Sequence, residues 1–170
     1  LNAQYNLGLI YYTGIDVPYD INKAIYYFTL ASNQNDADSQ YHLGIIYWDD
    51  QYARDINKSI YYYSLASKQN HIKAHIQLGF IYYNGKYIPK NISKAIHYFE
   101  LASKQNDPIA QYILGTIYYT DDYVICNIDK AIYYLELSSN QNNEDAQLLL
   151  GYIYLDEKNK KRDINKSVYY

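Results

Sequence analysis

The hydrophobic residues of this chain recur with the period of an α-helix, in two kinds of segment that alternate along the sequence. In the first kind, which we name helix A, apolar residues occupy positions i, i+4, i+7 and i+8, as at Ala3, Leu7, Ile10 and Tyr11. In the second, which we name helix B, they occupy i, i+3, i+7 and i+10, as at Ile21, Ala24, Phe28 and Ala31. Each spacing places its residues on one face of a helix, so both segments are predicted to be amphipathic helices.

Helix A and helix B together form a unit that is repeated along the chain. The block Leu-Gly-x-Ile-Tyr marks each helix A, and its glycine lies at Gly8, Gly44, Gly79, Gly115 and Gly151. A helix B follows each block and begins near Asp20, Asp55, Asn91, Asn127 and Asp163. Residues 1–170 therefore divide into a single array with repeats near 1–35, 36–70, 71–106, 107–142 and 143–170, of which the last is truncated. Since both ends interrupt the array, we expect further repeats or another domain in a longer chain.

The predicted ends of the helices carry residues that suit helix caps. Asp or Asn begins each helix B, where a short side-chain oxygen accepts a hydrogen bond from a free backbone N–H. Asn also ends helix B, and we expect the left-handed conformation that often terminates a helix at Asn35, Asn70, Asn106 and Asn142. Asp107-Pro108 is an N-cap followed by proline at the first helical position.

The glycine of each block lies in the middle of helix A, where glycine costs about 1 kcal/mol relative to alanine. Its recurrence in all five blocks indicates that helix B approaches closely at this point. Helix B offers a matching series of small residues, which we expect to lie at the crossing: Ala24, Ser59, Ala95, Ala131 and Ser167.

The complete pattern resembles the Sel-one-like repeat (SLR), a relative of the tetratricopeptide repeat. It consists of Ala-x-x-x-Leu-Gly-x-x-Tyr in helix A, a connection, and Asp/Asn-x-x-Lys-Ala-x-x-aromatic-aromatic in helix B. The first copy runs from Ala3 to Gln34, and five copies cover nearly the whole chain. The resemblance implies an all-α fold, a right-handed superhelical solenoid of antiparallel helix pairs with helix A on its concave surface.

The chain departs from the family pattern at several points. Tyrosine stands where the family usually has tryptophan, at Tyr27, Tyr62, Tyr98, Tyr134 and Tyr170. The second, fourth and fifth connections between helix A and helix B lack the usual glycine. A cysteine-bridged bacterial branch of the family has a disulfide in each repeat, whereas this chain has one cysteine, Cys126. The activities of that branch are therefore not carried over.

Composition and charge narrow the classes of partner. A net charge of −3 provides no basic surface for nucleic acid, and no apolar run is long enough to predict membrane insertion by this segment. The absence of a disulfide framework favours a cytoplasmic rather than a secreted location. Tyrosine accounts for 26 residues, and we interpret most of them as structural because five lie on the core face of helix A: Tyr11, Tyr47, Tyr82, Tyr118 and Tyr154.

No catalytic, cofactor-binding or metal-binding residue is predicted. His71 and His75 have the i, i+4 spacing of some metal sites, but His71 occupies a capping position that is aspartate in other repeats. The acidic pairs Asp49-Asp50 and Asp121-Asp122 lie in connections and are interpreted as solvated loop charges. The sequence contains none of the common nucleotide-binding, kinase or hydrolase signatures, so we expect no enzyme activity in this segment.

A stripe of variable residues on helix A is the candidate binding surface. Its members lie two residues before and one and five residues after each glycine, about 110° around the helix from the packing face. The packing positions hardly change between repeats whereas these positions differ, which fits either a surface that carries specificity or an idle surface free to vary. Ile45, Phe80 and Tyr152 would provide apolar anchors among polar neighbours. The stripe comprises Asn6, Leu9, Thr13, His42, Ile45, Asp49, Gln77, Phe80, Asn84, Ile113, Thr116, Thr120, Leu149, Tyr152 and Asp156.

The sequence therefore predicts a protein–protein interaction scaffold or adaptor that binds a peptide or protein partner on its concave helix A surface. Two alternatives stay open. Because the resemblance includes arrays attached to catalytic domains, the first is a regulatory or docking segment of a larger signalling enzyme such as a protein kinase. The second, by analogy with secreted relatives, is an array that binds carbohydrate or cell wall.

Overall fold

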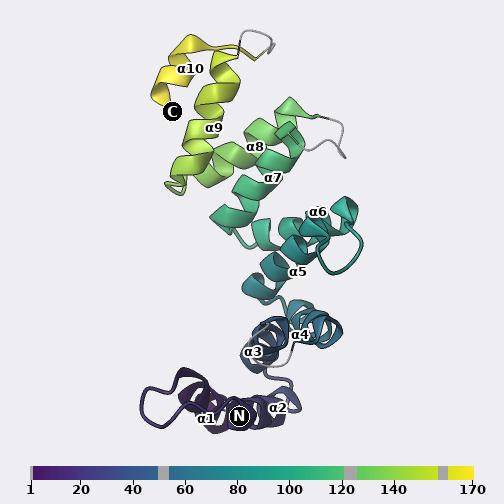
Figure 1. Cartoon of the computed structure of the whole chain (residues 1–170). Coiled ribbons are helices and arrows are strands. Elements are labelled where there is room, and N and C mark those ends of the chain that lie inside the picture. The colour runs from purple at the N-terminus through teal and green to yellow at the C-terminus, as the bar shows by residue number, and fades with distance from the viewer. Residues whose placement is uncertain (1, 50–53, 121–125, 157–160) are drawn as a thin grey trace. The chain divides into compact units, whose positions relative to one another are not determined.

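The computed structural model describes residues 2–49, 54–120, 126–156 and 161–170 (Figure 1). Within these residues the chain forms ten α-helices and no strand, which confirms the predicted all-α fold. The helix A segments are α1 (Asn2–Thr13), α3 (Ala37–Trp48), α5 (Ile72–Asn84), α7 (Pro108–Thr120) and α9 (Glu144–Leu155). The helix B segments are α2 (Ile21–Ser32), α4 (Ile56–Lys68), α6 (Ile92–Ser103), α8 (Ile128–Ser139) and α10 (Ile164–Tyr169).

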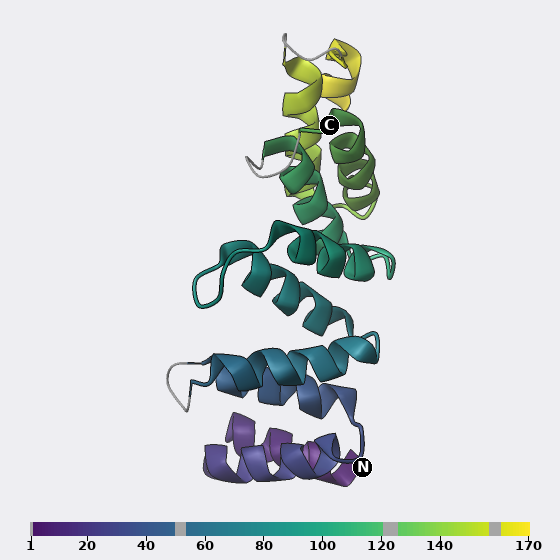
Figure 2. The same ribbon diagram turned by 90° about the vertical axis from the view of Figure 1, so that its right-hand side faces the viewer.

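The helices are packed in two compact units, Leu1–Pro89 and Lys90–Tyr170. In the first unit each helix packs against the next one along the chain, from α1 to α5 (Figures 1 and 2). In the second unit the same sequential packing runs from α6 to α10. Packing of each helix against its sequence neighbours is the arrangement of a solenoid, which confirms the predicted repeat architecture.

The hydrophobic core of each unit lies between successive helices. The completely buried residues of one core cluster in the first unit come from α2 and α3: Ala24, Phe28, Leu43 and Ile46. Those of a cluster in the second unit come from α8 and α9: Leu135, Ala146, Leu150, Ile153 and, almost completely buried, Tyr154. Both clusters use the positions that the helical periodicity assigns to the packing faces.

The predicted N-caps are confirmed. At each helix B the capping side chain accepts a hydrogen bond from the backbone N–H three residues later, at 3.0–3.1 Å, as Asp20 does from Lys23. Asp107 accepts from the N–H of Ala110 at 2.8 Å, and Pro108 is the first residue of α7. His71 also acts as a cap, because its Nδ1 accepts from a backbone N–H of α5 at 3.2 Å.

The junctions between repeats are built on asparagine in the left-handed conformation, as predicted. The φ angles of these residues lie between 60° and 65° at Asn35, Asn70, Asn106 and Asn142. The N–H of Asn35 donates to Ser32, and the N–H of Asp36 donates to the Ala31 carbonyl at 3.2 Å, which closes a Schellman motif. The Asp36 side chain then accepts from the N–H of Ser39 at 2.7 Å. One dipeptide therefore ends helix B and begins the next helix A.

Helix B approaches Gly8, Gly44 and Gly115 closely, as expected, but the small residues of helix B do not fill the contact. A Cβ added at Gly44 would lie 2.5 Å from the Tyr63 ring. The corresponding contacts are made by Phe28 at Gly8 and by Leu135 at Gly115. Each large side chain lies four residues after the small one, and at Ser59 the small residue instead donates a 2.7 Å hydrogen bond to the Gly44 carbonyl. The glycine thus makes room for a large side chain one turn further along helix B.

Tyrosine joins helix A to helix B in the first, second, fourth and fifth repeats. Near-parallel ring pairs, with centroids 5.7–6.0 Å apart, are formed by Tyr11 with Tyr27, Tyr47 with Tyr62, Tyr118 with Tyr134 and Tyr154 with Tyr170. In each pair a lysine from the start of helix B lies 4.8–5.0 Å from the centre of the helix A ring. The second tyrosine of each pair is the residue that replaces the tryptophan of the family pattern, so these tyrosines have a structural role.

We expect Gly44→Ala to lower the free energy of unfolding by about 1–3 kcal/mol, because the new Cβ would overlap the Tyr63 ring. Gly151→Ala is the matched control, since the nearest atom to a Cβ there is the Ser167 carbonyl oxygen at 3.6 Å. This second change should raise the free energy by up to about 1 kcal/mol, because alanine favours a helix. Urea unfolding followed by circular dichroism would measure both, and a shift in the same direction for both variants would contradict the explanation.

The end of α8 offers a second matched pair. Asn142 has φ 62° whereas Asn140 has φ −63°. Asn142→Gly should raise the free energy of unfolding by up to about 1 kcal/mol, because glycine adopts the left-handed region without strain. Asn140→Gly should lower it by about 0.5–1 kcal/mol, since it adds only flexibility. Urea unfolding would measure the free energy of unfolding of both variants. A stabilising effect of Asn140→Gly would argue against the backbone explanation.

Candidate functional site

The predicted stripe lies on the helix A segments and on the residues directly after them, and none of its members is buried. The exposed members are Asn6, Thr13, Asp49, Asn84, Thr120, Tyr152 and Asp156. The half-buried members are Leu9, His42, Ile45, Gln77, Phe80, Ile113, Thr116 and Leu149. Parts of this stripe line an open groove in each of the two units.

The groove in the first unit, which we name the second-repeat groove, has a volume of about 350 Å³ and is lined by Ile45, Trp48, Asp49, Arg54 and Tyr87. The Trp48 ring contacts Tyr87 edge-on, with centroids 5.3 Å apart. The Arg54 guanidinium lies 4.7 Å from the centre of the Tyr87 ring, and the Lys86 ammonium lies 4.9 Å from it. A hydrogen bond from Lys86, together with the charges of Arg54 and Lys86, lowers the pKa of Tyr87.

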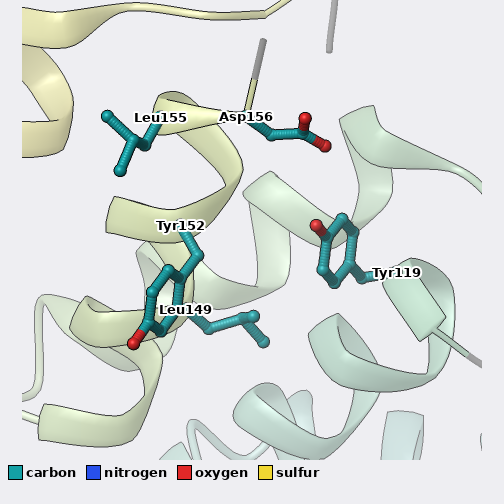
Figure 3. Close-up of a pocket in the computed structure, with 5 residues that line it drawn as sticks. All are labelled: Tyr119, Leu149, Tyr152, Leu155 and Asp156. Carbon is teal, nitrogen blue, oxygen red and sulfur yellow. The ribbon is translucent and has the colours of Figure 1, made fainter. Parts of the chain in front are cut away.

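The groove in the second unit, which we name the fifth-repeat groove, has a volume of about 450 Å³ and is lined by Tyr119, Leu149, Tyr152, Leu155 and Asp156. Tyr119 comes from α7 and the other residues from α9 and its end (Figure 3). Tyr152 and Leu155 are 58% and 52% exposed, so apolar surface faces the solvent here. Burial and the nearby Asp156 carboxylate raise the pKa of Tyr119.

The two grooves use equivalent positions of the repeat. Residues one, four and five places after the glycine line both of them: Ile45, Trp48 and Asp49 in one, and Tyr152, Leu155 and Asp156 in the other. Each groove therefore combines bulky apolar side chains with an aspartate that follows helix A directly. Equivalent positions of the second and fifth repeats thus line a groove, one in each unit.

Several lining residues lie outside the stripe predicted from the sequence. Trp48 and Leu155 lie four places after the glycine, at the border between the stripe and the packing face, and this position is also bulky at Tyr12, Tyr83 and Tyr119. That recurrence was a signal available in the sequence. Arg54 and Tyr87 belong to connections of different repeats, and no pattern within one repeat brings them together.

Some members of the stripe pack against neighbouring helices. The His42 ring stacks on Phe28 at 5.1 Å and contacts Tyr5 and Tyr12 edge-on, so it packs against the preceding repeat. Leu9 packs against the core cluster of α2 and α3, and Leu149 against that of α8 and α9. The cause is that helix A segments of successive repeats lie close enough for these side chains to bridge them. The binding role of the stripe stays a prediction.

The histidines and acidic residues considered in the sequence do not form a metal site among the described residues. Among them no group of three or more His, Cys, Asp or Glu side chains is placed to hold a metal ion. His75 is buried and shares a 2.9 Å hydrogen bond with Ser67, whereas His71 faces Asp38, so the pair does not converge on one ligand. Of the acidic pairs, Asp50, Asp121 and Asp122 lie outside the described residues. In the part of the chain that the structure describes, no helix has the length and apolarity to span a membrane.

Comparison with protein families gives one match, to the Sel1 repeat. Its model matches residues 1–36, 37–71, 72–107, 108–143 and 144–170. Each of these boundaries between repeats lies one residue later than the boundary that the sequence periodicity gives. None of the curated proteins compared matches this chain.

Several solved structures are similar to this chain. A protective antigen of uropathogenic Escherichia coli with an SLR fold is 27% identical over 99% of this chain and 36% of its own, with a TM-score of 0.91. A Sel1 repeat protein from Oxalobacter formigenes is 28% identical over 99% of this chain and 69% of its own, with a TM-score of 0.81. Cysteine-rich protein B of Helicobacter pylori is 30% identical over 78% of this chain and 96% of its own, with a TM-score of 0.58. This chain therefore spans little more than a third of the length of the Escherichia coli antigen.

The packing of His42 predicts a pH dependence of stability. Burial lowers the pKa of His42 below its ordinary 6.5, against the opposing hydrogen bond and charge of Asp38. The folded state therefore prefers the neutral ring, and stability is retained above pH 6.5 and lost as the pH falls from there through the folded-state pKa. Between pH 7 and pH 5 the free energy of unfolding should fall more in the wild type than in His42→Gln. Equal slopes in urea unfolding across this range would contradict the assignment.

Proposed function

The chain belongs to the Sel1 repeat family, whose members are generally protein–protein interaction scaffolds, and from this premise we propose that it binds a peptide segment of a partner protein in its helix A grooves. The Sel1 repeat fold is typically non-catalytic. We therefore assign a binding function to the grooves. In a longer chain, the same grooves would serve an attached signalling enzyme as its docking surface.

One observation carries the proposal: equivalent positions of the repeat form an open groove in both units. The core positions of these repeats are occupied by similar residues, whereas the groove positions differ in chemistry. Ile45 and Trp48 are replaced by Tyr152 and Leu155, so both grooves stay apolar while their shape and polarity change. Such variation on a constant frame is the way repeat proteins obtain specificity.

The fifth-repeat groove has the composition of a peptide-binding surface. Tyr152 and Leu155 expose apolar surface beside the carboxylate of Asp156, and aromatic anchors of this kind contribute strongly to protein interfaces. Leu149 forms part of the groove wall and is itself packed against the core of α8 and α9. A groove with a supported wall is preorganised, which reduces the entropy lost when a peptide binds.

The test is the affinity of peptides selected on the whole chain from a random display library. Truncating one anchor in each groove, in the double variant Ile45→Ala/Tyr152→Ala, should weaken binding of the selected peptides at least tenfold, about 1.4 kcal/mol. Peptides that occupy the second-repeat groove should also change the emission of Trp48, because it is the single tryptophan of the chain and lines that groove.

The matched control is Tyr61→Ala/Tyr133→Ala, on the helix B surface. Tyr61 and Tyr133 are 58% and 57% exposed, the same exposure as Tyr152, but they lie on α4 and α8. The affinity of this variant for the selected peptides should stay within about twofold of that of the wild type. This difference is small compared with the tenfold loss expected for the groove variant. A loss equal to that of the groove variant, or a selection that enriches no peptide, would refute the proposal.

A further inference from the structure

We propose that the junction between the second and third repeats is an acid-sensitive joint, in which protonation of His71 and His75 releases the first turn of α5. The inference is independent of the peptide grooves. The two histidines have the i, i+4 spacing of some metal sites, but the structure places them in two different roles at one helix start. The hydrogen bonds of the two rings support the proposal, and so do the residues that occupy their positions at the other junctions.

His71 caps α5 in a way that requires a neutral ring. Its Nδ1 accepts a hydrogen bond from the N–H of Ala74 at 3.2 Å, and its Nε2 lies 3.2 Å from a carboxylate oxygen of Asp38. Since an ionised carboxylate can only accept, the ring proton is on Nε2 and Nδ1 carries none. A second proton would bind at Nδ1, end the cap and place a positive charge at the positive end of the helix dipole.

The Asp38 carboxylate does not compensate for this loss. Its side chain is 62% exposed, and an ion pair at such a position contributes little to stability. His42 lies beside the same residue, with its Nδ1 2.8 Å from the Asp38 carbonyl oxygen, and the charges of His71 and Lys73 oppose protonation of the His42 ring. In acid, two charged rings and a lysine would therefore share this carboxylate, while the Asp36 carboxylate is engaged as the cap of α3.

The other groups around His71 do not replace the lost cap. Its ring stacks on Tyr41 of α3, with centroids 4.7 Å apart. Burial raises the pKa of Tyr41, and of Tyr5 on α1, so both phenols stay neutral in acid. Lys68 ends α4 and Lys73 lies in the first turn of α5, so the neighbouring lysines have the same sign as a charged His71. Histidine is the side chain whose charge ordinarily changes between about pH 5 and 8.

His75 joins the start of α5 to the end of α4. The ring is buried, with 1% exposed, and its Nδ1 shares a 2.9 Å hydrogen bond with the Ser67 hydroxyl. A buried ring loses water when it is charged, which costs free energy, so protonation of His75 accompanies opening of the first turn of α5. Opening at His71 would thus expose a second group that binds a proton, and the uptake of both protons would make the release cooperative.

The other junctions carry different residues at both positions. The position of His71 is occupied by side chains that cap through an oxygen: Asp36, Asp107 and Asn143. The position of His75 is glutamine in the other four helix A segments: Gln4, Gln40, Gln111 and Gln147. Glutamine carries no charge at any pH, and the aspartate and asparagine caps do not gain a positive charge in acid. Acid release is therefore expected at α5 and not at the equivalent start of α7.

Amide hydrogen exchange, followed by NMR on the whole ¹⁵N-labelled chain, tests the inference. Protection factors are referred to the exchange rate of an unfolded chain at each pH. From pH 7.5 to 5.5 those of the Ala74 and His75 amides should fall at least about fivefold, because proton binding is linked to opening. The Ala110 and Gln111 amides occupy the same positions in α7, which Asp107 caps, and their protection should change less than about twofold.

The double variant His71→Asp/His75→Gln gives the third repeat the residues of the other junctions and should abolish the acid loss of protection in α5. His71→Asn, which tests the cap alone, should remove most of it. His97→Gln, at an exposed histidine of α6, is the matched control and should retain the loss, as should His42→Gln. Unchanged protection of α5 in the wild type, a loss that survives the double variant, or an equal loss in α7 would overturn the inference.

Discussion

The contact between a mid-helix glycine of helix A and a large side chain of helix B, made at Gly8, Gly44 and Gly115, is the constraint on which the packing of these repeats depends. At Gly44 the Tyr63 ring lies where a Cβ would be, so the two helices approach to backbone distance. This contact fixes the rotation of helix A about its axis. The residue three places after the glycine then meets the tyrosine of helix B, and the residues one and five places after it face outward.

The capped junctions propagate this orientation from repeat to repeat. Asparagine in the left-handed conformation closes helix B, and the next residue already caps the following helix A. The change of direction takes place within a dipeptide whose hydrogen bonds are made by the backbone and one side chain. As a result, α3, α5, α7 and α9 begin in the same way. Equivalent residues therefore have equivalent surroundings, which explains why two grooves in different units share their lining positions.

Part of the chemistry of each groove comes from residues outside the glycine contacts and the capped junctions. Arg54 and Tyr87, from connections between helices, give the second-repeat groove a cation over an aromatic ring. Tyr119, from the preceding helix A, gives the fifth-repeat groove a second aromatic wall beside Asp156. Arg54 and Tyr87 lie in connections, so substitutions there would change the charge and shape of the groove at positions away from the helix crossing. A solenoid can therefore keep one fold while its grooves acquire different partners.

The sequence by itself determined the helices, their caps, the left-handed asparagines and the order of the repeats, because these features depend on interactions between residues close in the chain. It also placed the stripe on helix A and included Tyr152 and Asp156, since helical geometry assigns a direction to each position. Only the tertiary structure showed that Phe28, not a small residue, fills the contact at Gly8, and that His42 packs against the preceding repeat. Only the tertiary structure joined Tyr119 to α9 and Arg54 to Tyr87, because these contacts connect separate repeats and their distances depend on how successive helices pack.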